Sequence, residues 1–198
     1  LASANTKKYE KELFNSNISI KDKENLKTSL DEFSKKYWKK ATLEAEKIEN
    51  SLAKKIFYFF NLERKNTPAS FQELSSFINE NPDWPLINHL KKNAESAMSN
   101  DLKPGVILNW FGKRDPLTTV GWMHKIKAYL EIGEVKKARK IIKNVWINKN
   151  FVRHNEKYFY KLYRRHLTIK DHEQRLDRLL WEGKNWPVRR MLWKVNSS

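Results

Sequence analysis

A cluster of basic side chains between Lys136 and Arg165 is the stretch whose residue types and spacing most directly indicate chemistry. This window holds eleven Lys or Arg residues against one acid, Glu156, and so carries a net +10 of the chain's formal +17. Concentrated cations attract a polyanion, and the interleaved Tyr158, Tyr160 and Tyr163 could stack on its rings. The alternative is a solvated helix face, because an AT-rich genome also yields sequences rich in Lys and Asn.

The cations that we expect to contact a polyanion or a glycan are Lys136, Lys137, Lys140, Lys143, Arg153, Lys157, Arg164 and Arg165. Nucleic acid, anionic lipid and the carboxylate-bearing peptides of the cell wall all have the required charge. No RNA-binding or DNA-binding motif accompanies the window, so nucleic acid is the less favoured partner.

Residues for catalysis or metal binding are not grouped in the sequence. Cysteine is absent, which excludes disulfides, thiolate nucleophiles and thiolate metal sites, and there is no glycine-rich phosphate loop or nucleophile elbow. We therefore expect no cofactor and no metal. His172 is expected to pack and hydrogen bond at the start of a helix. The five histidines show no His-x-x-x-His spacing: His89, His124, His154, His166 and His172.

The elements that position these side chains are predicted to be helices. Thr168, followed three residues later by Asp171, forms a capping box that starts a helix, and the apolar residues of 169–180 then recur at helical spacing. Gly183 suits a left-handed C-terminal cap, and Pro187 suits the first turn of the next helix. Two short helices in a hairpin are expected.

The same pattern occurs fifty residues earlier and predicts an internal repeat of helix pairs. The matched positions are Leu130, Gly133, Arg139 and Ile142 with Leu180, Gly183, Arg189 and Leu192. A single pair buries only one side, so such pairs stack on one another. No segment shows sustained period-2 alternation. We expect an all-α superhelix (solenoid) of short antiparallel helix pairs, similar to tetratricopeptide repeats.

The rest of the chain is predicted as a tail over 1–20 followed by one scaffold domain over 21–198. Apolar spacing predicts a helix from Asp22 to Tyr37 and a second from near Thr42 to Glu63, and Ser70 with Glu73 opens another. Thr118 or Thr119 is expected to cap the helix of the first repeat.

Tryptophans and C-terminal arginines are expected to be mainly structural. Most of seven tryptophans lie at core spacing or at helix joints, and the others could line a groove and stack on sugars or bases: Trp84, Trp110, Trp122, Trp146, Trp181, Trp186 and Trp193. Four arginines lie near acids and are expected to form helix–helix ion pairs that each contribute little: Arg175, Arg178, Arg189 and Arg190.

About the last two thirds of the chain resembles the amino-terminal helical region of soluble lytic murein transglycosylases. The most specific segment is 171–192. The runs that carry the resemblance are Asn81 to Pro85, Trp110-Phe111, Pro116 to Thr118, Leu130 to Arg139, Asp171-His172, Arg175 to Glu182 and Arg189 to Leu192. The resemblance implies part of a ring-shaped superhelix carrying a lysozyme-like catalytic domain, which cuts peptidoglycan to 1,6-anhydro-muramic products.

In that family the catalytic acid lies in a Glu-Ser-x-Phe stretch, with a Gly-Leu-Met-Gln segment after it. Neither segment is present. Glu95-Ser96-Ala97-Met98 begins like the first, but it has Met in place of Phe, and we expect Glu95 to be an ordinary exposed residue of a helix. No catalytic residue transfers, so the lysozyme-like domain is not in this chain, which is predicted to be inactive alone. The implied partners are peptidoglycan and the enzyme's own catalytic domain.

Two features bear on location. The longest apolar run, Ile56 to Phe60, is far shorter than the ~20 residues that span a bilayer. Leu1 to Ala4 has the small-x-small form of a signal-peptidase site, and together with the resemblance it predicts export to the periplasm.

Two functions remain open. The first is a non-catalytic scaffold of a periplasmic lytic transglycosylase that guides glycan. The second is a stand-alone tetratricopeptide-like adaptor that binds acidic protein segments or nucleic acid through the basic face.

Overall fold

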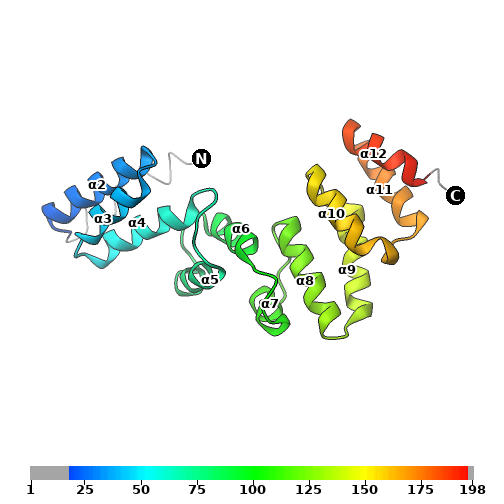
Figure 1. The fold of residues 1–198 in the computed structure, drawn as a ribbon, viewed down its shortest axis with the longest axis horizontal. Coiled ribbons are helices and arrows are strands. Elements are labelled where there is room, and N and C mark those ends of the chain that lie inside the picture. Colours follow the sequence, from blue (N-terminus) through cyan, green and yellow to red (C-terminus); the bar gives the residue numbers. More distant parts are fainter. Residues whose placement is uncertain (1–17, 196–198) are drawn as a thin grey trace. The chain divides into compact units, whose positions relative to one another are not determined.

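The described part of the chain is all-helical, as predicted from the sequence. The computed structural model describes residues 18–195, except for the side chain of Trp193, and this part contains eleven α-helices, one 3-10 turn and no strand (Figure 1). The helices form two compact units, the first ending at Asn93 and the second beginning at Ala94. Within 18–195 no helix combines the length and the apolarity needed to cross a membrane. The single scaffold domain over 21–198 and the export signal stay predictions, and Leu1 to Ala4 lie outside the described residues.

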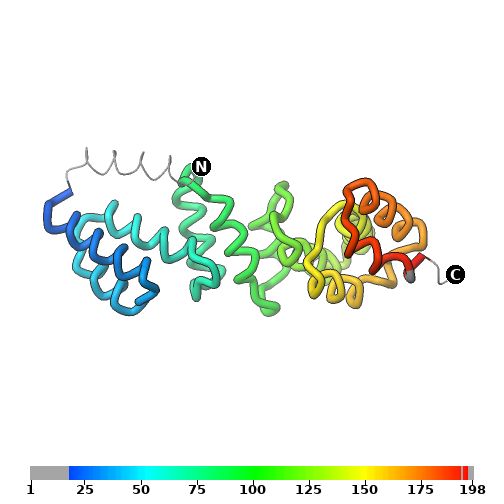
Figure 2. Tube along the Cα trace, turned by 90° about the horizontal axis from the view of Figure 1, so that it is seen from above, coloured from blue at the N-terminus to red at the C-terminus, as the bar shows by residue number. Residues whose placement is uncertain are grey.

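The first unit is built on three helices that lie side by side, α2, α3 and α4 (Figures 1 and 2). The helices of this unit are α2 (Ile20–Ser34), α3 (Trp38–Glu46), α4 (Ser51–Glu63), α5 (Phe71–Glu80) and the first turns of α6 (Ile87–Ala97). Its core is a cluster of Ile18, Leu26, Ala41, Ala45, Ile48, Ala53, Ile56 and Phe57.

Two predictions about the first unit were wrong. The helix expected from Thr42 to Glu63 is two helices, because the Asn50 side chain accepts the amides of Leu52 and Ala53 and so starts α4. The helix expected to reach Tyr37 ends at Ser34. Lys36 has a φ of 66° and reverses the chain, which leaves Tyr37 60% exposed.

The second unit contains the stacked helix pairs. Its remaining helices are α7 (Pro104–Phe111), α8 (Thr119–Glu131), α9 (Val135–Asn148), α10 (Arg153–Tyr163), the 3-10 turn η1 (Arg164–His166), α11 (Ile169–Trp181) and α12 (Asn185–Val195). Helix α8 packs on α9, α9 on α11, and α11 on α12 (Figure 1). The shared core consists of Trp122, Met123, Ile126, Ala138, Ile142, Val145, Trp146, Phe151, Phe159, Tyr163, Leu179 and Met191.

The predicted repeat corresponds to two helical hairpins, α8–α9 and α11–α12. Gly133 and Gly183 both have positive φ, 79° and 64°, and turn the chain between the helices of each pair. The first helices of the two hairpins are capped by Thr118 and Thr168. The capping box of Thr168 and Asp171 is present, as is that of Ser70 and Glu73.

The prediction for Glu95 was wrong, because this side chain is fully buried. Its Oε1 accepts the backbone amide of Leu117 at 2.9 Å and lies 3.4 Å from Nη1 of Arg114. Its Oε2 accepts both the amide and the hydroxyl of Thr118, each at 2.7 Å. Glu95 therefore fixes the start of α8, and its carboxylate is occupied by internal donors.

Candidate anion-binding groove

A groove between α10 and α12 brings together basic side chains that are more than twenty residues apart in the sequence. It consists of two hollows, each of about 580 Å³, that share Arg153 and Arg190. The α10 wall is formed by Arg153, Glu156, Lys157, Tyr160 and Lys161, continued by Arg164, and the α12 wall by Trp186, Arg189, Arg190 and Lys194. The lining thus has seven cations and one carboxylate, and it lies entirely within the second unit.

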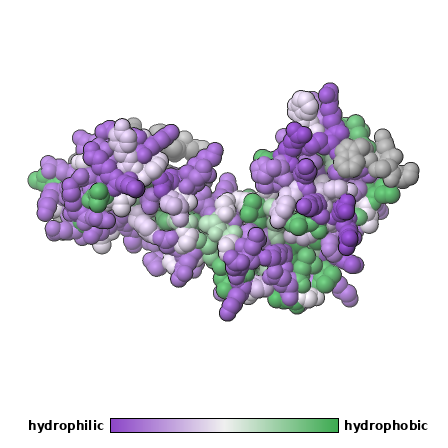
Figure 3. All heavy atoms as spheres, in the orientation of Figure 1, coloured by the Kyte–Doolittle hydropathy of each residue, from purple (hydrophilic) through white to green (hydrophobic). Residues whose placement is uncertain are grey.

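The helical period of α10 explains why its cations share one face. Arg153, Lys157 and Lys161 follow one another at intervals of four residues, so they form one stripe along the helix. The opposite face carries Phe159 and Tyr163, which are buried in the core. Burial of this apolar face turns the basic stripe outward. On the face drawn in Figure 3, hydrophilic side chains gather over α10.

Five of the seven cations make no ion pair with a carboxylate of the described residues. They are Arg153, Lys157, Lys161, Arg164 and Arg189. Like charges held close together repel one another and destabilise the fold. An anionic ligand in the groove would remove this repulsion, which is why the groove is the strongest candidate site.

The one carboxylate of the groove holds a groove arginine in place. Glu156 is 4% exposed; its Oε1 accepts Nε of Arg190 at 3.2 Å and its Oε2 accepts Nη2 of Arg190 at 2.8 Å. Hydrogen bonding to Glu156 raises the pKa of Arg190. A two-point contact of this kind fixes the plane of the guanidinium, so Arg190 forms a rigid part of the α12 wall.

Arg175 supports Glu156 from inside the core. It is 1% exposed, donates to the backbone carbonyls of Trp146 and Lys149, and lies 3.5 Å from Glu156. Burial lowers the pKa of Arg175 to about 10, although Glu156 acts in the opposite direction. Because Arg175 is buried, loss of Glu156 would leave its charge without a carboxylate partner in the core, whereas after loss of Arg175 the Glu156 carboxylate would keep Arg190.

The prediction that the four C-terminal arginines form helix–helix ion pairs was therefore wrong for two of them, Arg178 and Arg189. Arg175 belongs to a buried network. Arg178 pairs locally, at 2.6 Å, with Glu182, the residue that follows α11. Arg189 makes no ion pair with a described carboxylate and instead lies over the ring of Trp186, 5.4 Å from its centre. Arg175 and Arg190 both pair between helices, each with Glu156 of α10.

Lys194 lies at the end of the groove opposite Trp186. Its Nζ is 3.6 Å from the centre of the Tyr160 ring, a cation–π contact. Burial lowers the pKa of Lys194 to about 8, against the opposing influence of Glu156. Lys194 therefore carries most of its charge at neutral pH.

The structure separates the cations that the sequence grouped. Arg153, Lys157 and Arg164 line the groove. Lys136, Lys137, Lys140 and Lys143 lie on α9, Arg165 lies on η1, and none of these five lines it. Two of the α9 lysines are paired, Lys137 with Glu134 at 3.1 Å and Lys143 with Asp171 at 3.2 Å.

Sequence reasoning missed Lys161 and the α12 wall. Lys161 continues the four-residue spacing of Arg153 and Lys157, so the helical period could have identified it. No local signal could have identified Arg190, because only tertiary packing brings it to Glu156, 34 residues earlier.

The predictions for the aromatic residues were partly right. Trp122 and Trp146 are buried, and Nε1 of Trp146 donates to Nδ1 of the buried His172 at 3.0 Å, in the packing role expected for that histidine. Burial lowers the pKa of His172. Trp181 and Trp186, in contrast, are 86% and 72% exposed. The side chain of Trp193 lies outside the description.

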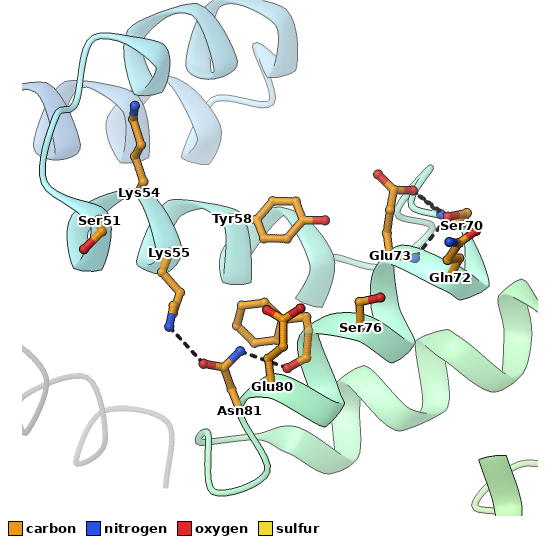
Figure 4. A pocket seen from close by; sticks show the side chains of 11 residues that line it. Ser51, Lys54, Lys55, Tyr58, Ser70, Gln72, Glu73, Ser76, Glu80 and Asn81 are labelled. Atoms are coloured by element: carbon orange, nitrogen blue, oxygen red, sulfur yellow. Dashed lines mark hydrogen bonds between the residues drawn. The ribbon is translucent and has the colours of Figure 1, made fainter. Parts of the chain in front are cut away.

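A second groove, between α4 and α5 of the first unit, shows that a hollow of similar size need not be basic (Figure 4). It measures about 620 Å³, and its charged residues are balanced, Lys54 and Lys55 against Glu73 and Glu80. Lys55 also donates to Asn81 at 3.1 Å. The α4–α5 groove therefore lacks the excess charge of the α10–α12 groove.

No three His, Asp or Glu side chains in the part of the chain that the structure describes are placed to hold a metal ion together. Comparisons of this chain with known protein families, with curated proteins and with solved structures find no match.

Proposed function

We propose that this chain is a non-catalytic helical scaffold whose α10–α12 groove holds an anionic cell-wall strand. The observation that carries the proposal is the set of five groove cations without a carboxylate partner among the described residues. Trp186, at one end of the groove, adds an exposed ring on which a sugar can stack.

The surroundings of two buried carboxyl groups, those of Glu156 and Glu95, favour binding of a glycan over its cleavage. A general acid for glycan cleavage needs a carboxyl that can give a proton to the substrate. Glu156 is held by Arg190 and Arg175, and Glu95 by Thr118, Leu117 and Arg114. These two buried carboxylates are committed to the fold, so the chain is expected to hold a strand and leave its cleavage to another domain.

The resemblance to soluble lytic transglycosylases supplies the identity of the strand. Peptidoglycan carries carboxylates on its peptides, which match the charge of the groove, and the enzyme implied by the resemblance acts in the periplasm. In such an enzyme this region would hold the strand while the lysozyme-like domain cuts it.

Co-sedimentation with purified peptidoglycan sacculi tests the proposal. The double variant Arg153→Ala/Lys157→Ala removes two groove cations, whereas Lys136→Ala/Lys140→Ala removes two cations of the same charge from α9. We expect the wild type and the α9 variant to sediment with sacculi, and the groove variant to be released at lower salt. Failure of the wild type to bind sacculi would refute the proposal. Release of anhydro-muropeptides by the purified chain would refute its non-catalytic part.

A stand-alone adaptor for acidic protein segments or nucleic acid is the second candidate, and the same unpaired cations favour it. Competition separates the two functions. The adaptor would be favoured if a modest excess of single-stranded DNA or of an acidic polypeptide released the chain from sacculi, while sacculi did not release the chain from the DNA or the polypeptide.

A further inference from the structure

The spacing of the cations on α10 indicates what part of a ligand they contact. An α-helix rises about 1.5 Å per residue, so Arg153, Lys157 and Lys161 follow one another at about 6 Å. Arg164 continues the row on η1. Each step of four residues turns only about 40° round the helix, so the row runs along one side of α10 and matches an anionic group that repeats at a similar distance.

An extended peptide has such a repeat. Alternate side chains of an extended chain point to the same side and lie about 7 Å apart. A peptide with carboxylates on alternate residues therefore presents all of them to one row of cations. A peptide with the same carboxylates on adjacent residues points part of its charge away from the row.

The α12 wall directs the ligand toward α10. Arg190 is held by Glu156, and Lys194 lies on the ring of Tyr160, so these two cations face the groove from fixed positions. The cations without a carboxylate partner are concentrated on the α10 side. Trp186 lies near Arg153, at one end of the row.

We propose that the α10–α12 groove recognises an extended peptide with carboxylates on alternate residues, and that this peptide lies along the row of Arg153, Lys157, Lys161 and Arg164. The inference goes beyond the proposed function, because it names a peptide with a defined spacing of carboxylates, and not a sugar strand, as a ligand of the groove. The ring of Trp186 then covers the end of the peptide beside Arg153.

Two labelled peptides of identical composition and charge provide the test, Glu-Ala-Glu-Ala-Glu and Ala-Glu-Glu-Glu-Ala, with binding to the full chain followed by fluorescence anisotropy at low salt. We expect the alternating peptide to bind several-fold more tightly. Lys157→Ala should weaken its binding by about two- to fivefold, the range of an exposed ion pair, and Lys140→Ala on α9 should leave it unchanged. Circular dichroism of both variants verifies that they are folded.

Equal affinity for the two peptides would overturn the inference, as would equal losses in Lys157→Ala and Lys140→Ala. Tighter binding of an oligonucleotide of equal charge would overturn it in favour of a phosphate ligand. Co-sedimentation with sacculi separates this inference from the proposed function. If sacculi bind and the two peptides bind equally, the function stands and the inference fails; if the alternating peptide binds more tightly and sacculi do not bind, the inference holds for the groove and the function fails.

Discussion

In the second unit, the helix pairs α8–α9 and α11–α12 both begin with a threonine whose amide and hydroxyl donate to a carboxylate. The carboxylate belongs to a different element in each pair. In the second pair the amide and the hydroxyl of Thr168 both donate to Asp171 of the same helix, at 2.7 Å each. In the first pair the amide and the hydroxyl of Thr118 donate at the same distances to Glu95, which belongs to α6. One helix start is stabilised locally and the other by tertiary structure.

Gly121 makes the tertiary arrangement possible. It occupies the position in α8 that Asp171 occupies in α11, fifty residues later. A Cβ at position 121 would lie 2.7 Å from the carboxyl carbon of Glu95, so a side chain there and the buried carboxylate exclude each other. The comparison shows that a repeat can keep the hydrogen bonds of a cap while the residue that supplies them moves to another element.

The largest expected effect is the loss of the tertiary cap. Glu95→Ala removes three strong hydrogen bonds and the partner of Arg114, and it leaves buried donors at the start of α8 without acceptors. We expect the free energy of unfolding of the second unit to fall by about 3 to 5 kcal/mol, as for other broken buried pairs. Urea unfolding followed by circular dichroism measures it. A loss below about 1 kcal/mol, the size of an exposed pair, would show that Glu95 does not hold α8.

Replacing the tertiary cap of α8 by a local cap like that of α11 tests the comparison more sharply. Gly121→Ala alone should destabilise the second unit by about 1 to 3 kcal/mol through overpacking against Glu95, although Ala in place of Gly normally favours a helix. In the Glu95→Ala background, Gly121→Asp should instead recover part of the lost stability, because it recreates the local cap of α11. The double variant then tests the equivalence of the two caps. If Gly121→Asp destabilises both backgrounds equally, the equivalence is refuted.

The local cap should show a smaller effect and a defined pH dependence. Burial opposes the ionisation of Asp171, but hydrogen bonds from Thr168 and Lys143 outweigh it and lower the pKa of the carboxyl. A carboxyl with a lowered folded-state pKa stabilises the protein above its unfolded pKa, and this contribution is lost as the pH falls through the folded pKa. Asp171→Ala should therefore cost about 1 to 2 kcal/mol at pH 7.

Urea titrations of wild type and Asp171→Ala at a series of pH values verify the sign of this dependence. The two curves should converge on acidification below the ordinary range of an Asp carboxyl. Asp171→Asn is the matched control, since it keeps the shape of the side chain and lacks its titration. A stability difference that stays constant from pH 7 to strongly acidic pH would contradict the assignment.

The two caps also show what the sequence could and could not reveal. The Thr168 box was predicted because its partners are three residues apart, a distance that local spacing can identify. Glu95 was predicted to be exposed, because its partners lie on the far side of a loop and no local pattern marks them. The two walls of the groove differ in the same way. The helical period predicts the cations of the α10 wall, whereas the contact of Arg190 with Glu156 depends on the packing of α12 and could not be predicted. Helix positions follow from local chemistry, but the second wall of a site follows from tertiary structure.

The smallest effect is expected at the turns, where the two pairs should behave alike. Gly133 and Gly183 both have positive φ, and an added Cβ at either position meets no other atom within 4 Å. Substitution therefore costs only the strain of a left-handed backbone, about 1 kcal/mol for an Ala at either site. Thermal unfolding of Gly133→Ala and Gly183→Ala should show similar shifts in Tm. A much larger shift at Gly133 would mean that the turn of the first pair depends on tertiary contacts, as its cap does, and that the two hairpins differ at both ends of their first helix.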